Sequence, residues 1–212
     1  MASLSHESPQ APQACLLAPA SACAGCTLNT QLKCRFKRAD LMHFMVLAFG
    51  FMLPAAIGLI QGGQVAALIG WVAFMLFFFE VWEIRILCSH CPYYAEPGRT
   101  LHCIANYGSL KLWRYHPEPM SRAERRQLYA GFVLFGGLPF PFLLAGGQIV
   151  LAFLAGWGLL AFFFTLKKTI CTTCVNFSCP LNGVPKATRD AYLRRNPTMR
   201  AAWEQHGYHL ED

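Results

Sequence analysis

The sequence predicts an all-α integral membrane protein. We expect four transmembrane helices arranged as two duplicated helical hairpins, with Cys-rich cytoplasmic loops stapled together by metal. Three observations predict this class. Hydrophobic residues make up 55% of the 212 residues and charged residues only 14%, whereas about 25% is usual for soluble domains. The apolar residues fall into four long blocks, and nine of the ten cysteines lie outside the blocks in three groups that each contain a Cys-x-x-Cys pair.

The four apolar blocks have the length of membrane-spanning helices, which need about 20 mostly apolar residues. They are Leu41–Ile60, Gly62–Phe79, Leu128–Ala145 and Ile149–Leu166. Each lacks Asp, Glu, Lys and Arg, which argues against buried helices of a soluble domain. The short connectors 61–64 and 146–148 predict that each pair of helices forms an antiparallel hairpin.

All 18 Lys and Arg residues lie on one predicted side of the membrane. They precede the first block, lie between the second and third, or follow the fourth, and the two short connectors carry none. The positive-inside rule therefore predicts that both termini and all cysteines are cytoplasmic, most simply at a prokaryotic inner membrane. The same distribution explains the net charge of +7 by topology and by contact with anionic lipid headgroups. It does not favour nucleic-acid binding.

The predicted organisation alternates Cys-rich segments with hairpins. Residues 1–22 lack the features of a secretory signal and are expected to form a flexible tail. The Cys-rich segments are 23–40, 84–127 and 167–212, and the hairpins are 41–83 and 128–166. The hairpins look duplicated, because four features recur in the same order at offsets of 83 to 86 residues. The pairs are Pro54 with Pro139, Gly70-Trp71 with Gly156-Trp157, Phe77–Phe79 with Phe162–Phe164, and Cys88 and Cys91 with Cys171 and Cys174.

Nine cysteines form three groups, each a Cys-x-x-Cys pair with a third Cys downstream. The groups are Cys23, Cys26 and Cys34; Cys88, Cys91 and Cys103; and Cys171, Cys174 and Cys179. Two thiolates three residues apart on a tight turn can converge on one metal ion, and a third nearby thiolate fills most of the coordination sphere. A single pair could be a redox dithiol, but three such groups favour metal. Cys15, in the predicted tail, is interpreted as a bystander or an optional ligand.

The pattern leaves the metal open between an iron–sulfur cluster and zinc. Clusters such as 4Fe-4S are held mainly by Cys thiolates, and the dipeptides Cys91-Pro92 and Cys179-Pro180 occur in bacterial ferredoxin runs, although the ferredoxin spacing is absent. Zinc would accept four Cys, or three Cys with His90 or His102. Three triads would each lack a fourth ligand, whereas eight cysteines could build two four-Cys sites shared across segments.

The leading functional hypothesis is a membrane-anchored iron–sulfur protein that passes electrons to or from the membrane or a partner subunit. The alternatives are a zinc-stapled membrane scaffold or assembly factor, and soft-metal handling by the Cys pairs. The expected partners are the lipid bilayer and a protein, either a redox subunit or a second copy. The chain contains no phosphate-binding loop or Ser-His-Asp nucleophile pattern, so no catalytic residue is predicted. Glu80 is a candidate proton carrier if the partner is a quinone.

Overall fold

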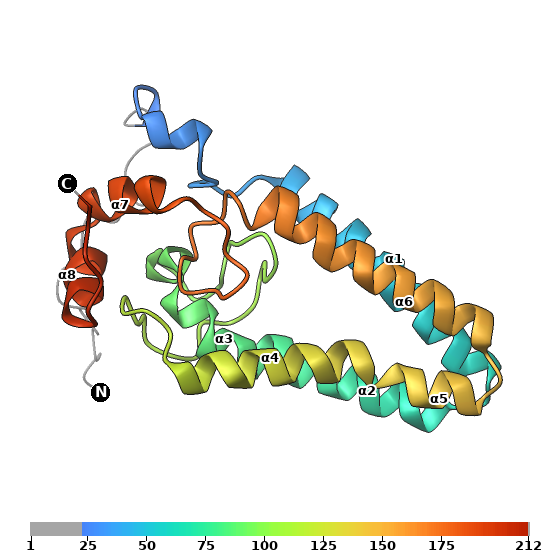
Figure 1. Ribbon diagram of the computed structural model, residues 1–212. Helices are drawn as coiled ribbons and strands as arrows, with labels where there is room; N and C mark the ends of the chain where they lie inside the picture. Colours follow the sequence, from blue (N-terminus) through green and yellow to red (C-terminus); the bar gives the residue numbers. More distant parts are fainter. Residues whose placement is uncertain (1–22, 212) are drawn as a thin grey trace, which may run out of the picture.

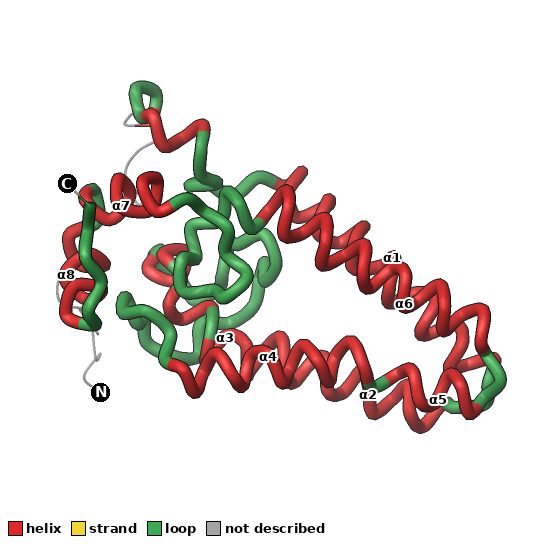
Figure 2. The backbone as a smooth tube through the Cα atoms, in the orientation of Figure 1, coloured by secondary structure: helices red, strands yellow, loops and turns green. Residues whose placement is uncertain are grey.

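The computed structural model describes residues 23–211, which fold almost entirely into helices and loops (Figures 1 and 2). The predicted flexible tail 1–22, including Cys15, and Asp212 lie outside the described residues. Within the described range, the only β-type pairing is one isolated antiparallel bridge between Thr100 and Leu110. The molecule has two parts, a set of long apolar helices and a compact Cys-rich loop region at one end of them.

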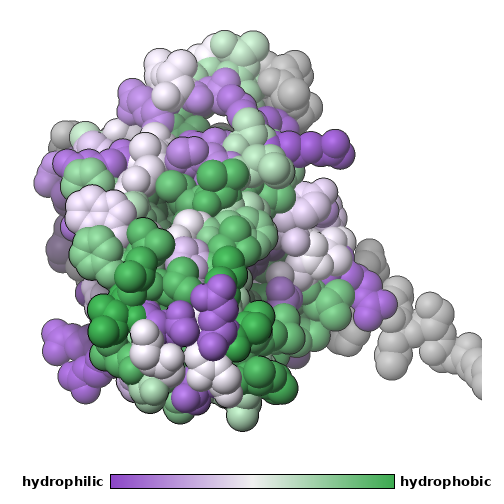
Figure 3. Space-filling model, turned by 90° about the vertical axis from the view of Figure 1, so that its right-hand side faces the viewer, coloured by the Kyte–Doolittle hydropathy of each residue, from purple (hydrophilic) through white to green (hydrophobic). Residues whose placement is uncertain are grey.

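Within the described residues, four helical stretches are long and apolar enough to cross a membrane, as expected of a multi-pass membrane protein. The first is α1 (Arg38–Gln61). The second joins α2 (Val65–Phe77), the π-helix η4 (Phe78–Trp82) and α3 (Glu83–Ile86), the third joins α4 (Arg122–Gly137) and α5 (Pro139–Ala145), and the fourth joins α6 (Ile149–Thr165) and the π-helix η7 (Leu166–Ile170). Large apolar side chains such as Val133, Val150 and Phe153 face outward, about 70% exposed. Figure 3, which views the end with the hairpin turns, shows this apolar surface in green.

The two hairpin turns have the same backbone geometry. Gly63 and Gly147 both adopt φ +70°, in the left-handed region that glycine enters without steric cost. The preceding glycines, Gly62 and Gly146, also have nearly equal angles, φ −78° and ψ 4° against φ −81° and ψ 5°. A Cβ atom on Gly62 would lie 3.1 Å from the Cα of Gly146. The two turns therefore pack directly against each other at the end far from the cysteines.

The helices pair mainly across the hairpins rather than within them. From the turns, α1 runs antiparallel along α6, and α2 runs antiparallel along α4 and α5, so the two pairs diverge toward the Cys-rich end (Figures 1 and 2). Small residues permit this close approach: a Cβ on Gly158 of α6 would lie 2.3 Å from the carbonyl oxygen of Gly50 in α1. On the other pair, the ring of Phe78 fills the space beside Gly131. Neighbours within a predicted hairpin thus meet chiefly near their turn.

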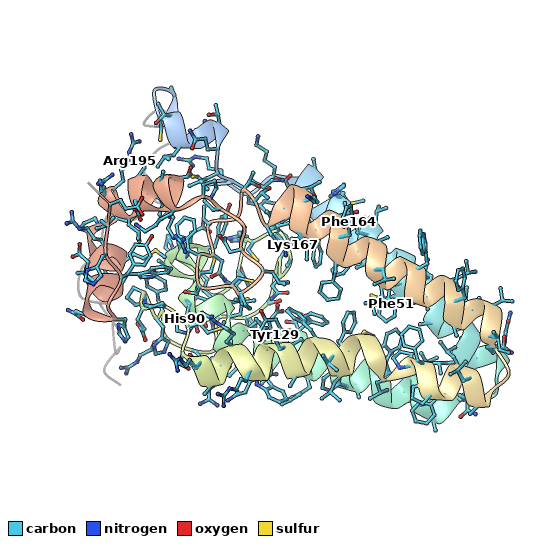
Figure 4. All side chains as sticks on the ribbon, viewed as in Figure 1. Phe51, His90, Tyr129, Phe164, Lys167 and Arg195 are labelled. Atoms are coloured by element: carbon cyan, nitrogen blue, oxygen red, sulfur yellow. The ribbon has the colours of Figure 1, made fainter. Side chains whose placement is uncertain are left out.

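The two repeat-related prolines have different consequences. Pro54 lies inside a continuous α1, whereas Pro139 opens α5 after a break at Leu138. A proline has no N–H, so the carbonyl four residues earlier loses its helical donor. For Pro139 that carbonyl belongs to Phe135, and it accepts a hydrogen bond of 2.9 Å from the indole Nε1–H of Trp71. Phe51 packs edge-on against both rings and lies between the helix pairs (Figure 4).

The three Cys-rich segments fold together into one loop region. It contains α7 (Lys186–Arg194), α8 (Pro197–Gln205) and short 3₁₀ turns at Thr27–Thr30, Cys88–His90 and Pro92–Ala95. Hydrogen bonds tie the segments to one another: Lys33 N–H donates to the Thr173 carbonyl (2.8 Å), and Trp203 Nε1–H donates to the Pro117 carbonyl (3.0 Å). A shared apolar core includes Leu32, Cys91, Phe177 and Trp203. Segments far apart in the sequence therefore form one structural unit.

Candidate functional site: a thiol cluster in the Cys-rich loops

Two Cys-x-x-Cys turns lie where two spanning helices enter the loop region. The helix that includes η4 and α3 leads through Leu87 into Cys88, and the helix that ends in η7 leads directly into Cys171. In both helices the final turns include a π-helical segment, a form that is rare and occurs mostly as short insertions at functional sites. The similar placement of both turns agrees with the offset seen in the sequence.

Cysteines of the second and third groups lie near one another. Burial raises the pKa of the Cys91 thiol well above its ordinary value, and the nearby thiols of Cys174, Cys103 and Cys179 raise it further. Burial likewise raises the pKa of Cys179, with added contributions from Cys174 and Cys171. We call Cys91, Cys103, Cys174 and Cys179 the thiol cluster. Its members come from two loops separated by about a full hairpin, so the structure mixes the two sequence groups.

Amide groups donate hydrogen bonds to several of these sulfurs. The backbone N–H of Asn106 lies 3.2 Å from Cys103 Sγ, and that of Asn176 lies 3.4 Å from Cys174 Sγ. The side-chain amide of Asn106 donates to Cys88 Sγ and to the buried Glu83 carboxylate, each at 3.1 Å. These contacts place Cys88 next to the thiol cluster.

Sequence reasoning missed Asn106, Asn176 and Glu83. The signal for the asparagines was present, because an Asn follows Cys103 by three residues and Cys174 by two. Glu83 was passed over in favour of Glu80, which turns out to be exposed, whereas Glu83 is 6% exposed. The carboxylate that contacts the cysteine region is therefore the one nearer to Cys88.

The first cysteine group does not converge on one point. Cys23 accepts a hydrogen bond from Arg35 at 3.4 Å, and Cys26 accepts one from Arg195 at 2.7 Å. Cys34 instead joins the apolar core that contains Cys91 and Tyr93. Burial raises the pKa of Tyr93, and the thiols of Cys91, Cys174, Cys103 and Cys34 add to the shift. Among the first group, Cys34 therefore lies nearest to the environment of the thiol cluster, and Cys26 packs at the border of the same core.

The two histidines suggested as zinc ligands are engaged with other groups. Nδ1 of His90 donates to the carbonyl of Glu118 at 2.7 Å, and its Nε2 lies 3.5 Å from the Glu124 carboxylate. His102 lies 3.6 Å from the Glu96 carboxylate. Within residues 23–211, no three His, Cys, Asp or Glu side chains form a group that could hold a metal ion as placed. The iron–sulfur or zinc ligation therefore stays a prediction. The thiols of the cluster lie in one core, but their sulfur atoms are not arranged around a common metal position.

The arrangement offers sulfur donors in a buried setting with amide hydrogen bonds directed at them, at the end of two membrane-spanning helices. No family model matches the chain, and neither a curated protein nor a solved structure does so.

Proposed function

We propose that the chain is a membrane-anchored iron–sulfur protein that passes electrons between a cytoplasmic donor and an acceptor in the membrane or in a partner subunit. The observation that carries this proposal is the gathering of cysteines from two distant loops in one buried region. Iron–sulfur clusters are held by Cys thiolates, and four cysteines of the thiol cluster would supply one complete set. The bound cluster would supply one-electron chemistry, and the protein would supply the ligands and their surroundings.

The chemistry of the donors supports the fit. Thiolates are stable in a buried site when a cation compensates them and N–H groups donate to them. The N–H groups of Asn106 and Asn176 already point at Cys103 and Cys174. Hydrogen bonds to ligand sulfurs are also one of the ways in which a protein sets a cluster's reduction potential.

The proposed first ligand set is Cys91, Cys103, Cys174 and Cys179, drawn together when the cluster binds. Cys88 and Cys171, the leading residues of their pairs, together with Cys34 are the nearest candidates for a second site or for ligand exchange. Cys23 and Cys26 would remain at the edge, because both sulfurs are engaged by arginine side chains. This assignment follows the alternative in which four cysteines from different segments share one site, rather than the alternative of three separate three-Cys sites.

The proposed location is the cytoplasmic face of a prokaryotic inner membrane. Every Lys and Arg of the sequence lies in the segments at the Cys-rich end or beyond it, and the two hairpin turns carry none. The cytoplasm keeps thiols reduced, so that free cysteines remain available as ligands. The same basic segments would contact anionic headgroups and a redox partner.

Elemental analysis and an absorption spectrum of anaerobically purified protein in detergent test the proposal. We expect iron and acid-labile sulfide in about equal amounts, with broad absorption near about 400 nm that bleaches with dithionite. A colourless protein with stoichiometric zinc would overturn the electron-transfer proposal and favour a zinc-stapled scaffold. Exchangeable monovalent copper would instead favour soft-metal handling.

A further inference from the structure

An apolar groove of about 350 Å³ opens between α4 and α6, where the two helix pairs diverge. Phe132, Val133 and Gly137 of α4 line one wall, Leu159 and Phe163 of α6 line the other, and Leu181 closes the Cys-rich end. Tyr129 supplies the one polar side-chain atom among the groove's lining residues. A groove of this composition at membrane depth suits a hydrocarbon chain.

The length of the groove matches one leaflet of a bilayer. Its lining on the third spanning stretch extends from Tyr129 to Phe140. Eleven helical residues rise about 16 Å, and half of a hydrocarbon core of about 30 Å is about 15 Å. The groove begins at the Cys-rich end, so it spans the leaflet on that side.

Three basic residues lie within about one helical turn of residues that line the end of the groove nearest the loop region. Arg125 and Arg126 precede Tyr129 by four and three residues, which places them on the same side of α4. Lys167 follows Phe163 by four residues on the opposite helix. Figure 4 shows Tyr129 and Lys167 on either side of the gap between the helix pairs. All three cations are exposed, and the ion pairs found in the described part of the chain involve none of them.

We propose that this groove is a binding site for one anionic phospholipid, with an acyl chain lying along the contact of α4 with α6, where the rings of Phe132 and Phe163 meet edge-on, and with its phosphate near Arg125, Arg126 and Lys167. The cations distinguish the occupant from a neutral isoprenoid such as a quinone, whose head would gain nothing from three positive charges. Leu181 contacts the chain from the same loop that carries Cys179. The lipid therefore stabilises the loop region as well as the helices, whatever metal that region holds.

Native mass spectrometry of the full chain, purified in a mild detergent, tests the site. We expect one tightly retained anionic phospholipid per chain. Gly137→Leu fills the groove, because a Cβ at this residue meets no atom within 4 Å, and it should abolish retention. Gly70→Leu is the matched control, since Gly70 in α2 has equally open space and lies away from the groove. Equal retention by both variants would overturn the proposal.

The headgroup contact is tested separately by adding phosphatidylglycerol or phosphatidylcholine to delipidated protein. Each cation near a membrane surface changes anionic-lipid affinity by about fivefold. Lys167→Gln should therefore lower the preference for phosphatidylglycerol about fivefold, and by more than Lys168→Gln, because the Nζ of Lys168 lies 6.0 Å from the ring centroid of Phe164, a residue that does not line the groove. Equal binding of both lipids to the unaltered protein, or a retained neutral isoprenoid, would refute the anionic assignment.

Discussion

Cys91 occupies a different environment from Cys26, although both belong to Cys-x-x-Cys pairs. Cys91 is 7% exposed and has thiol neighbours from two loops, among them Cys103 and Cys174. Cys26 is only partly buried at the border of the same core, and its sulfur accepts a hydrogen bond from Arg195. Position in the pair therefore does not decide whether a cysteine can act as a ligand, and the surrounding loops do.

This difference gives a prediction on metal content. Cys91→Ser should remove most of the bound iron and the absorption near about 400 nm, because it deletes the central donor of the thiol cluster. Cys26→Ser should retain both, since its thiol is engaged outside the cluster. Iron and sulfide are measured on each variant after anaerobic purification. Equal loss of iron and sulfide from both variants would contradict the proposed ligand set and would mean that Cys26 is also a ligand.

Asn106 connects a buried carboxylate to two cysteines, and its removal should destabilise the loop region. Asn106→Ala leaves the Glu83 carboxylate without its amide donor and removes a hydrogen bond to Cys88 Sγ. A buried polar group without its partner costs about 1–3 kcal/mol. The thermal unfolding midpoint in detergent should fall accordingly, whereas Asn29→Ala, at an exposed residue, should change it little. An unchanged midpoint for Asn106→Ala would show that the bonds to Glu83 and Cys88 add no net stability.

Among the elements, the hairpin repeat offers a matched pair of tryptophans. Trp71 is 1% exposed and donates to the carbonyl of Phe135 that Pro139 leaves without a helical donor. Its counterpart in the repeat, Trp157, is 67% exposed on α6. The carbonyl that loses its helical donor to a proline therefore has different surroundings in the two copies. The Phe135 carbonyl accepts from Trp71, whereas the Gly50 carbonyl, four residues before Pro54, lies against the backbone of α6 near Gly158.

Trp71→Phe should lower stability much more than Trp157→Phe. The first change keeps an aromatic ring but leaves the Phe135 carbonyl unsatisfied in an apolar setting, which costs about 1–3 kcal/mol. The second change removes an exposed indole that has no such role. Thermal unfolding of both variants in the same detergent gives the comparison. Similar midpoints for the two variants would mean that the indole hydrogen bond does not secure the break in the third span.

The sequence predicts the elements better than their partners. Long apolar blocks without charge dictate helices, so Leu41–Ile60 lies within α1. The Ser-x-x-Glu spacing of Ser121 and Glu124 is typical of a capping box, and these two residues do cap the start of α4. Helix pairing across the hairpins depends on single glycines, such as Gly158, that permit close contact between helices. The lengths of the apolar blocks do not indicate which helices make such contacts. The same holds for the cysteines. Spacing groups them by segment, but the folding of three segments onto one core decides that Cys91 lies near Cys174, which belongs to another sequence group.

Across the whole molecule, the described cysteines and the basic residues gather at the end with the loop region, and the hairpin turns at the opposite end contain neither. The hairpin turns contact each other through Gly62 and Gly146, which fixes the far end. The helix pairs diverge from there and leave room for the loop region between their opposite ends (Figure 1). All Lys and Arg residues belong to the segments at that end, so the charge asymmetry and the cysteines define the same side.

This asymmetry predicts the orientation, which site-directed thiol labelling in intact cells can measure. A cysteine introduced by Gln61→Cys at an exposed turn residue should react with a membrane-impermeant maleimide before lysis. A cysteine introduced by Ala187→Cys, exposed on α7, should react only after the membrane is broken. Moving an end with 18 basic residues across the membrane is opposed by the same bias that orients other helical membrane proteins. The reverse labelling pattern would place the cysteines in an oxidising compartment, where disulfides compete with metal for the thiols, and would remove the premise of a cytoplasmic electron donor.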